Sequence, residues 1–206
     1  MTFSNYLTDQ GSVLVLDASV VINLLATGQS DAILKSLNVP LLVTDSVVRE
    51  LEQGATEGRQ EFGLLTKAIN DQILKLERLE GTALRTFFEL VSGDASNSLG
   101  DGEAATLALA DGYGFIAAID EKKATRIAAE RFCALKLVTT IDILAHERVQ
   151  AALGDEKLAE ATFDALRFAR MQVRDCQFDW VVNIIGDAKV QACPSLRRHA
   201  RLKTLK

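Results

Sequence analysis

The sequence has few of the residues that common active sites are built from. Its 206 residues include two histidines and three cysteines. The histidines occur in no H-E-x-x-H motif or recognisable catalytic triad, and the cysteines are widely spaced with no C-x-x-C pair. We therefore expect structural thiols rather than disulfides or a cysteine-ligated metal. Nothing in the sequence points to a serine, cysteine or histidine nucleophile.

Other absences narrow the class of protein. No apolar run is long enough to cross a bilayer, and the opening residues, MTFSNYLTDQGS, lack the basic-then-apolar order of a signal peptide. The expected location is therefore cytoplasmic, with no membrane partner. A G-x-x-x-x-G-K-[ST] loop is also missing, which argues against a P-loop NTPase.

The charge balance is acidic, with 28 acidic against 23 basic residues. Because phosphate contacts need local positive charge, such a chain is not an obvious nucleic-acid binder. Carboxylates gathered around a divalent ion would reverse that local field. One stretch, 194–206, is basic and contains no acid, which is typical of a solvated chain end, with nucleic-acid binding as the alternative. Its basic residues are Arg197, Arg198, Arg201, Lys203 and Lys206.

Short apolar runs alternate with segments of helical spacing along the chain. Strands are predicted at 13–16, 40–43, 115–119 and 135–138, and 73–79 fits either a strand or a helix continuation. Helices are predicted at 20–25, 32–37, 47–51, 60–70, 82–91, 102–110, 122–131, 141–152 and 155–168. This alternation predicts an α/β fold with a central parallel sheet covered by helices on both faces. We expect one domain over 1–152 and a helical extension with a basic tail over 153–206.

Acidic residues follow the predicted strands. Asp17 and Asp120 each come directly after an apolar run, and parallel strands would bring both to the same edge of the sheet. Glu50 lies beside the apolar stripe of the next helix. For the third acidic position we prefer Glu103, with Asp101 as the helix N-cap or an outer group. Each acid alone is also explained by helix capping or by the helix dipole.

Four carboxylates in one cleft would repel one another, and without a counter-charge some would take up protons. Mg²⁺ or Mn²⁺ resolves this, since both favour oxygen ligands and retain water. Such an ion can convert water into a nucleophile and stabilise the attacking and leaving oxygens of a phosphodiester. The acidic pattern therefore points to metal-assisted phosphodiester hydrolysis.

Five segments in order resemble the motifs of PIN domains. They are V-L-V-L-D-A-S-V-V-I-N at 13–23, L-L-V-T-D-S-V-V-R-E at 41–50, L-G-D-G-E-A-A-T-L-A at 99–108, F-I-A-A-I-D-E-K-K at 115–123 and V-T-T-I-D-I-L at 138–144. The resemblance implies a three-layer α/β/α PIN-like fold. It also implies a VapC-like endoribonuclease that uses Mg²⁺ or Mn²⁺ and is often the toxin of a toxin–antitoxin pair.

The resemblance also implies roles for particular residues. The catalytic acids would be Asp17, Glu50, Glu103 and Asp120, with Asp17, Glu103 and Asp120 as metal ligands. Supporting positions would be Ser19, Asn23, Thr44, Asp101 and Thr140. The implied partners are an RNA substrate, an antitoxin protein and a second copy of the chain.

Two features leave alternatives open. The chain is longer than a minimal PIN domain between Glu50 and Gly100 and after Ala152. These additions and the acidic charge fit a non-catalytic PIN-like protein-interaction module as the second hypothesis. A phosphotransfer protein is a weaker one, because Asp17 is followed by Ala-Ser rather than by D-x-D.

Overall fold

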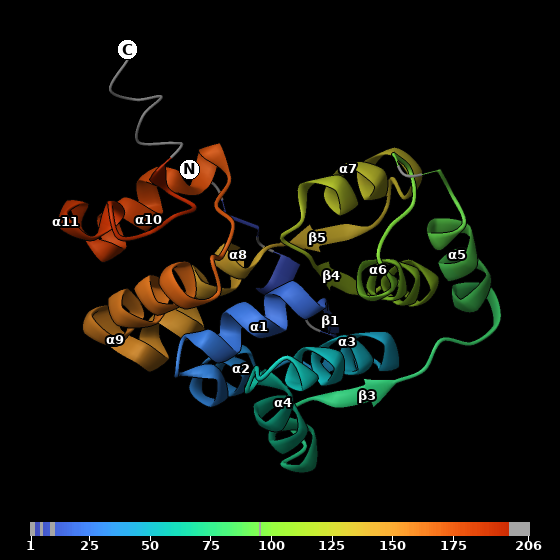
Figure 1. Ribbon diagram of the computed structural model, residues 1–206, viewed down its shortest axis with the longest axis horizontal. Helices are drawn as coiled ribbons and strands as arrows, with labels where there is room; N and C mark the ends of the chain where they lie inside the picture. The colour runs from blue at the N-terminus through green and yellow to red at the C-terminus, as the bar shows by residue number, and fades with distance from the viewer. Residues whose placement is uncertain (1–2, 5, 9–10, 95, 198–206) are drawn as a thin grey trace. The chain divides into compact units, whose positions relative to one another are not determined.

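The computed structural model describes residues 3–4, 6–8, 11–94 and 96–197 (Figure 1). The chain divides into two compact units. The sheet unit consists of Ser4–Val21 and Asn38–Thr139. The helical unit consists of Met1–Phe3, Ile22–Leu37 and Thr140–Lys206.

The described part of the sheet unit contains one five-stranded sheet in which every neighbouring pair is parallel. Its strands are β1 (Leu14–Leu16), β2 (Leu41–Thr44), β3 (Lys75–Glu77), β4 (Ile116–Ala118) and β5 (Lys136–Val138). The spatial order is β3-β2-β1-β4-β5, so the direction of winding reverses between β1 and β4. Open α/β sheets bind ligands outside the carboxyl ends of the strands at such a reversal.

Burial explains why these segments form strands. Every residue of β1, β2 and β4 is buried, which matches their apolar sequences, broken only by Thr44 at the end of β2. By contrast, all three residues of β3 are exposed, as suits the edge of the sheet. The undecided segment 73–79 is thus a short edge strand.

Helix α6 (Asp101–Tyr113) forms the centre of the sheet unit. Residues 104–110 are all buried, and the helix contacts β1, β2 and β4. Its core neighbours include Val15, Leu42 and Ala117. The helix ends at Gly114, whose φ of 67° is the left-handed conformation that suits glycine at a helix end. A helix buried on all sides holds its first turn in a fixed position.

Four other helices of the sheet unit were predicted, and they are α3 (Asp45–Thr56), α4 (Glu61–Asn70), α5 (Gly81–Val91) and α7 (Lys122–Arg131). The short 3-10 helix η1 (Tyr6–Thr8) was not predicted. Helix α1 (Ala18–Ala26) begins in this unit, directly after β1. The parallel sheet flanked by helices confirms the expected α/β/α fold class.

The helical unit differs from the prediction at one junction. We predicted one helix over 141–152 and another over 155–168. Instead, the chain forms α8 (Thr140–Leu144) and then α9 (Glu147–Phe168), whose interior residue Gly154 has non-helical angles. His146 causes the earlier break, because its Nδ1 accepts a hydrogen bond from the Arg148 N–H (3.3 Å) and caps α9.

The remaining helices of this unit are α2 (Ser30–Leu37), η2 (Asp175–Gln177), α10 (Phe178–Ile185) and α11 (Asp187–Val190). Helix α2 packs against α9, where Arg148 Nη1 donates to the Leu37 carbonyl (3.1 Å). The expected domain boundary at 152/153 falls just before the irregular Gly154 and stays a prediction.

Three further predictions concern the cysteines, the basic stretch 194–206 and membrane spans. Cys133 and Cys176 are exposed, Cys193 is buried, and all three are free thiols. Of the basic stretch, Arg197 donates to the Gln191 carbonyl (3.2 Å). The rest of its basic side chains lie outside the described residues: Arg198, Arg201, Lys203 and Lys206. Across the described helices, none combines the length and apolarity that a membrane span requires.

Candidate functional site

Asp17 is placed at the winding reversal by the backbone around it. Its N–H donates to the Ala118 carbonyl of β4 (3.1 Å), and its own carbonyl accepts from the Val21 N–H (3.0 Å) as α1 begins. The residue is only 2% exposed. Strand β1 therefore delivers this carboxyl group, as predicted, to the carboxyl end of the sheet between β1 and β4.

The two oxygens of the Asp17 carboxyl group differ in their partners. Oδ2 accepts hydrogen bonds from Ser19 Oγ (2.7 Å) and from the Ser19 N–H (3.2 Å). Oδ1 is buried and has no hydrogen-bond partner within the described part of the chain. Since an unsatisfied buried acceptor is costly, this oxygen is arranged to receive something from outside the protein.

Glu50 approaches Asp17 across Gly102. A Cβ at Gly102 would lie 2.6 Å from Glu50 Oε2 and 3.4 Å from Asp17 Oδ1. Both carboxylate oxygens therefore border the small space that the absent side chain leaves. Thr44 fixes the start of α3, which carries Glu50, by accepting a hydrogen bond from the Val47 N–H (3.4 Å).

Glu103 joins the same group of charges from the first turn of α6. It is half-buried, and its Oε2 accepts from the Gly100 N–H (3.3 Å). Burial raises its pKa to about 7, and the negative charges of Asp17, Glu121 and Glu50 contribute to the rise. The carboxyl group thus caps α6 and also lies in the field of the other acids.

The prediction that Asp101 caps this helix is wrong. The N-cap is Gly100, and Asp101 is the first helical residue, with an exposed side chain. Its charge still reaches the site, because it contributes to the raised pKa of Glu50. Of the two acids considered for the third position, Glu103 is the half-buried one.

Asp120 and Glu121 follow β4. Asp120 is 5% exposed. Glu121 is half-buried and caps α7, accepting from the Ala124 N–H (2.7 Å). The charge of Glu121 raises the pKa of both Asp17 and Glu103. Sequence reasoning missed Glu121, although the adjacent Asp-Glu pair after a buried strand was the available signal.

The carboxylates disfavour one another's charged forms. Burial raises the pKa of Asp17 although the Ser19 hydrogen bonds oppose the rise. Glu50 is exposed as a residue, yet desolvation raises the pKa of its carboxyl group first and the charge of Asp17 raises it further, while Arg59 opposes the rise. A cation would remove this repulsion, so the site has the electrostatics of a cation site.

The oxygen-only donor set suits Mg²⁺ or Mn²⁺, which keep several waters and need few protein ligands. The unpartnered Asp17 Oδ1 and the space beside Gly102 provide a free ligand atom and room. Among the described residues, no group of three or more histidine, cysteine, aspartate or glutamate side chains is arranged to hold a metal ion. The fit to a divalent ion therefore rests on Asp17 Oδ1 and Glu50 Oε2, which border the same small space.

Two of the predicted supporting positions belong to the other compact unit. Asn23 and Thr140 belong to the helical unit, where Asn23 Nδ2 donates to Thr140 Oγ1 (3.3 Å). The sheet unit brings together the charges of Asp17, Glu50, Glu103 and Glu121. Asp120 follows β4 and Ile119 directly, so its backbone lies at the carboxyl end of that strand.

Fold and site together define a class: a parallel α/β protein with an acidic, oxygen-rich site where the central strands end. A family model described as a PIN domain matches residues 13–186, so the chain belongs to the PIN domain family. This match confirms the family that the sequence motifs indicated. No curated protein and no solved structure gave a significant match. PIN domains are in general nucleases and typically depend on divalent metal ions.

Proposed function

We propose that the chain is a Mg²⁺- or Mn²⁺-dependent endoribonuclease that hydrolyses RNA phosphodiester bonds. The observation that carries the proposal is the buried Asp17 Oδ1, which has no partner among the described residues and borders the same space as Glu50 Oε2. Most buried carboxylate oxygens in proteins have a hydrogen-bond partner, so an unpartnered one beside a second carboxylate supports a bound cation. Membership of the PIN family supports the reaction class.

The residues that would hold the ion are Asp17, Glu103 and Asp120. When bound, the ion supplies Lewis acidity, which lowers the pKa of a water and offsets charge on the phosphate. Ser19 orients Asp17 by its two hydrogen bonds to Oδ2, which leaves Oδ1 directed at the site. Glu50, whose pKa is raised, accepts at Oε2 the proton of the attacking water.

The test is RNA cleavage by the wild type, by Asp17→Asn and by Asp120→Asn in Mg²⁺ or Mn²⁺. Losing one ligand carboxylate is expected to reduce the rate by about 100-fold or more. Asp111→Asn is the matched control, because Asp111 is an exposed residue of α6. Undiminished cleavage by both site variants would rule out the proposal.

The second hypothesis, a non-catalytic interaction module, makes a separate prediction. It expects no stabilisation by divalent metal, whereas a nuclease site binds the ion only in the folded state. A rise in Tm in millimolar Mn²⁺ that is lost in Asp17→Ala would argue against the module. The interaction-module hypothesis is motivated in part by the net charge of −5, which disfavours binding of a nucleic acid. A divalent ion bound at the acidic site would reverse the negative field there.

The toxin role and the antitoxin partner are narrower hypotheses that rest on the family resemblance alone. They predict that expression of the chain arrests growth and that Asp17→Asn abolishes the arrest. They also predict that a small DNA-binding protein encoded next to it relieves the arrest. Growth unaffected by the active wild-type enzyme would leave a nuclease without a toxin function.

A further inference from the structure

Arg59 lies against helix α3 on a surface shaped by Gly54. The backbone N–H groups of Arg59 (3.2 Å) and Glu57 (3.0 Å) both donate to the Gly54 carbonyl. A Cβ at Gly54 would lie 3.3 Å from Arg59 Cδ and 3.6 Å from Nη1. The aliphatic part of the arginine therefore packs where a larger residue at position 54 would place its side chain.

This packing places the arginine stem one helical turn along α3 from Glu50. Gly54 follows Glu50 by four residues on α3, so both lie on the same face of the helix. The charge of Arg59 lowers the pKa of Glu50, which places it within electrostatic reach of that carboxylate. Arg59 is thus a basic side chain whose charge acts on the acidic site.

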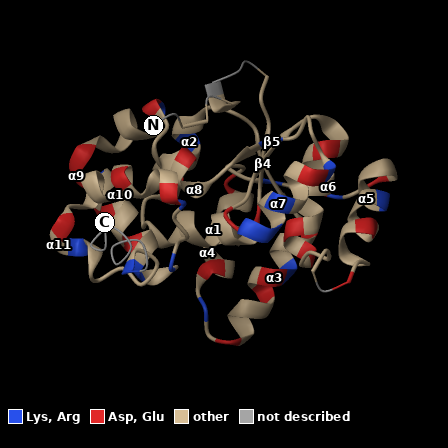
Figure 2. Cartoon of the chain, turned by 90° about the horizontal axis from the view of Figure 1, so that it is seen from above, with Lys and Arg blue, Asp and Glu red and all other residues tan. Residues whose placement is uncertain are grey.

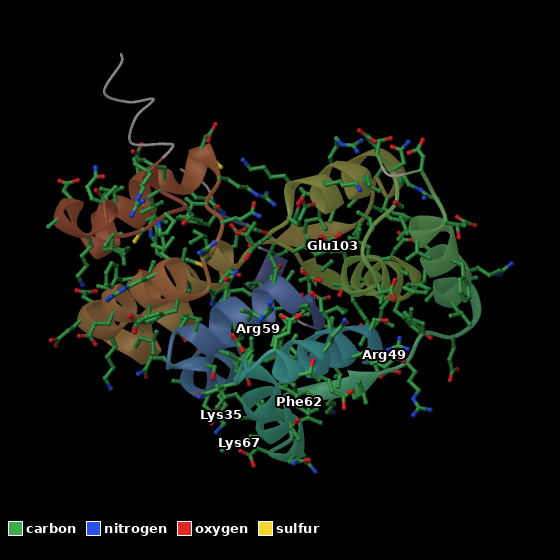
Figure 3. The ribbon with its side chains drawn as sticks, in the orientation of Figure 1. Lys35, Arg49, Arg59, Phe62, Lys67 and Glu103 are labelled. Atoms are coloured by element: carbon green, nitrogen blue, oxygen red, sulfur yellow. The ribbon has the colours of Figure 1, made fainter. Side chains whose placement is uncertain are left out.

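Nearby basic residues are engaged with their own neighbours. Figure 3 labels Arg49 and Lys67 on α3 and α4, together with Arg59 and with Glu103 of α6. Arg49 pairs with Asp45 (3.6 Å) and donates to Ser46 Oγ (3.1 Å), and Lys67 pairs with Asp71 (2.6 Å). Figure 2 likewise shows red and blue segments interspersed over the helices, without one large block of either sign.

The present partner of Arg59 can be exchanged. Its Nη2 lies 3.0 Å from Glu57 Oε2, and both side chains are more than half exposed. Exposed ion pairs of this kind contribute little to stability, so a competing anion can replace the glutamate. A guanidinium fork matches a phosphate diester with two parallel hydrogen bonds.

We propose that Arg59 is a substrate-binding residue of this site and holds the phosphate next to the scissile one in a nucleic-acid strand. The inference rests on the proposed nuclease function. An acidic site repels a polyanion, so a strand that binds there needs a fixed cation beside it. Gly54 provides that fixation by letting the arginine stem lie flat on α3.

The test compares Arg59→Ala, Arg59→Lys and Gly54→Ala with the wild type. The matched control is Arg85→Ala, an exposed arginine on α5. Binding of a single-stranded RNA oligonucleotide is measured by fluorescence anisotropy in the Asp17→Asn background without metal, so that no cleavage occurs. Arg59→Ala should weaken binding about tenfold, as expected for one charge-assisted contact, and reduce the salt slope by about 0.7.

In cleavage assays, Arg59→Ala should raise KM about tenfold and change kcat little. Arg59→Lys should keep the salt slope and lose part of the affinity, because lysine cannot form the bidentate pair. Gly54→Ala should weaken binding by less than Arg59→Ala, since it displaces the stem and keeps the charge. A substrate that carries only the scissile phosphate should be cleaved equally by wild type and Arg59→Ala.

The outcomes separate the two proposals. If the wild type cleaves RNA but Arg59→Ala has the same KM and salt slope, the assignment of Arg59 is overturned and the nuclease function stands. If RNA binds with an Arg59-dependent salt slope but is never cleaved, the nuclease function fails and the phosphate site stands. A wild type that neither binds nor cleaves RNA overturns both.

Discussion

At the scale of single residues, Asp17 shows a conflict between stability and function. The carboxyl group is buried, its pKa is raised, and one of its oxygens is unpartnered in the described structure. Asp17→Asn removes the buried charge and keeps an oxygen that can accept from Ser19. We expect the metal-free variant to be about 1–3 kcal/mol more stable than wild type at pH 8, the cost of a poorly compensated buried group.

The measurement is urea denaturation at pH 8 in the presence of a chelator. The exposed substitution Asp111→Asn should leave the free energy of unfolding within about 0.5 kcal/mol of wild type. A destabilised Asp17→Asn would mean that the carboxylate contributes to folding without metal, contrary to the electrostatics described above.

Glu103 gives a prediction for pH. Its folded pKa, about 7, lies above the ordinary glutamate value of 4.5, so the folded state binds this proton more tightly than the unfolded state. Its contribution to stability is therefore fully present below about pH 4.5 and is lost as pH rises to about 7. The linked free energy is below about 3 kcal/mol, because solvent screens a half-exposed carboxyl group.

The comparison of wild type with Glu103→Gln isolates this term from the other carboxylates. In metal-free protein, the variant should gain stability over wild type between pH 5 and pH 8, measured as the difference in free energy of unfolding. A difference that does not change over this range would contradict the raised pKa of Glu103.

At the scale of elements, Gly102 is where α6 and α3 approach closely. A Cβ there would lie 2.6 Å from Glu50 Oε2, a distance that forces the carboxyl group to move. Gly102→Ala should therefore lower cleavage by about tenfold or more, as loss of correct positioning does. Alanine favours a helix over glycine by about 1 kcal/mol, so the fold should be retained.

Gly63→Ala in α4 is the matched control. Gly63 is an exposed helical glycine, and a Cβ there would meet nothing within 4 Å. It should stabilise the protein by about 0.5–1 kcal/mol and leave cleavage unchanged. Equal activity of the two variants would show that the space beside Gly102 is not needed for the reaction.

Elements also show what the sequence could predict. Strands β1 and β4 were predictable because burial on both faces requires a continuous apolar run, and an acid ends each run. The break before α9 was missed because His146 replaces the usual Ser, Thr, Asp or Asn as the cap. Gly102 and Glu121 were missed because their roles arise from tertiary approach: one makes room for Glu50, and the other adds its charge to those of Asp17 and Glu103.

At the scale of the whole molecule, metal binding should link the site to the stability of the protein. A ligand that binds only the folded state adds about 1.4 kcal/mol for each tenfold increase above its Kd. Because the acids must ionise to bind the ion, this gain should increase from pH 6 to pH 8, opposite to the metal-free trend of Glu103. Tm measured against Mn²⁺ concentration at both pH values tests the linkage.

The stabilisation by Mn²⁺ and the metal-free contribution of Glu103 should change with pH in opposite directions. The experiment therefore tests whether the ion binds at the acidic site. In wild type, Mn²⁺ should raise Tm more at pH 8 than at pH 6, while Asp17→Asn should show little rise at either. Asp111→Asn should behave as wild type, because Asp111 lies in the last turn of α6, at the opposite end of the helix from Glu103. Stabilisation that is independent of pH and unchanged in Asp17→Asn would place the metal elsewhere and separate the acidic site from divalent ions altogether.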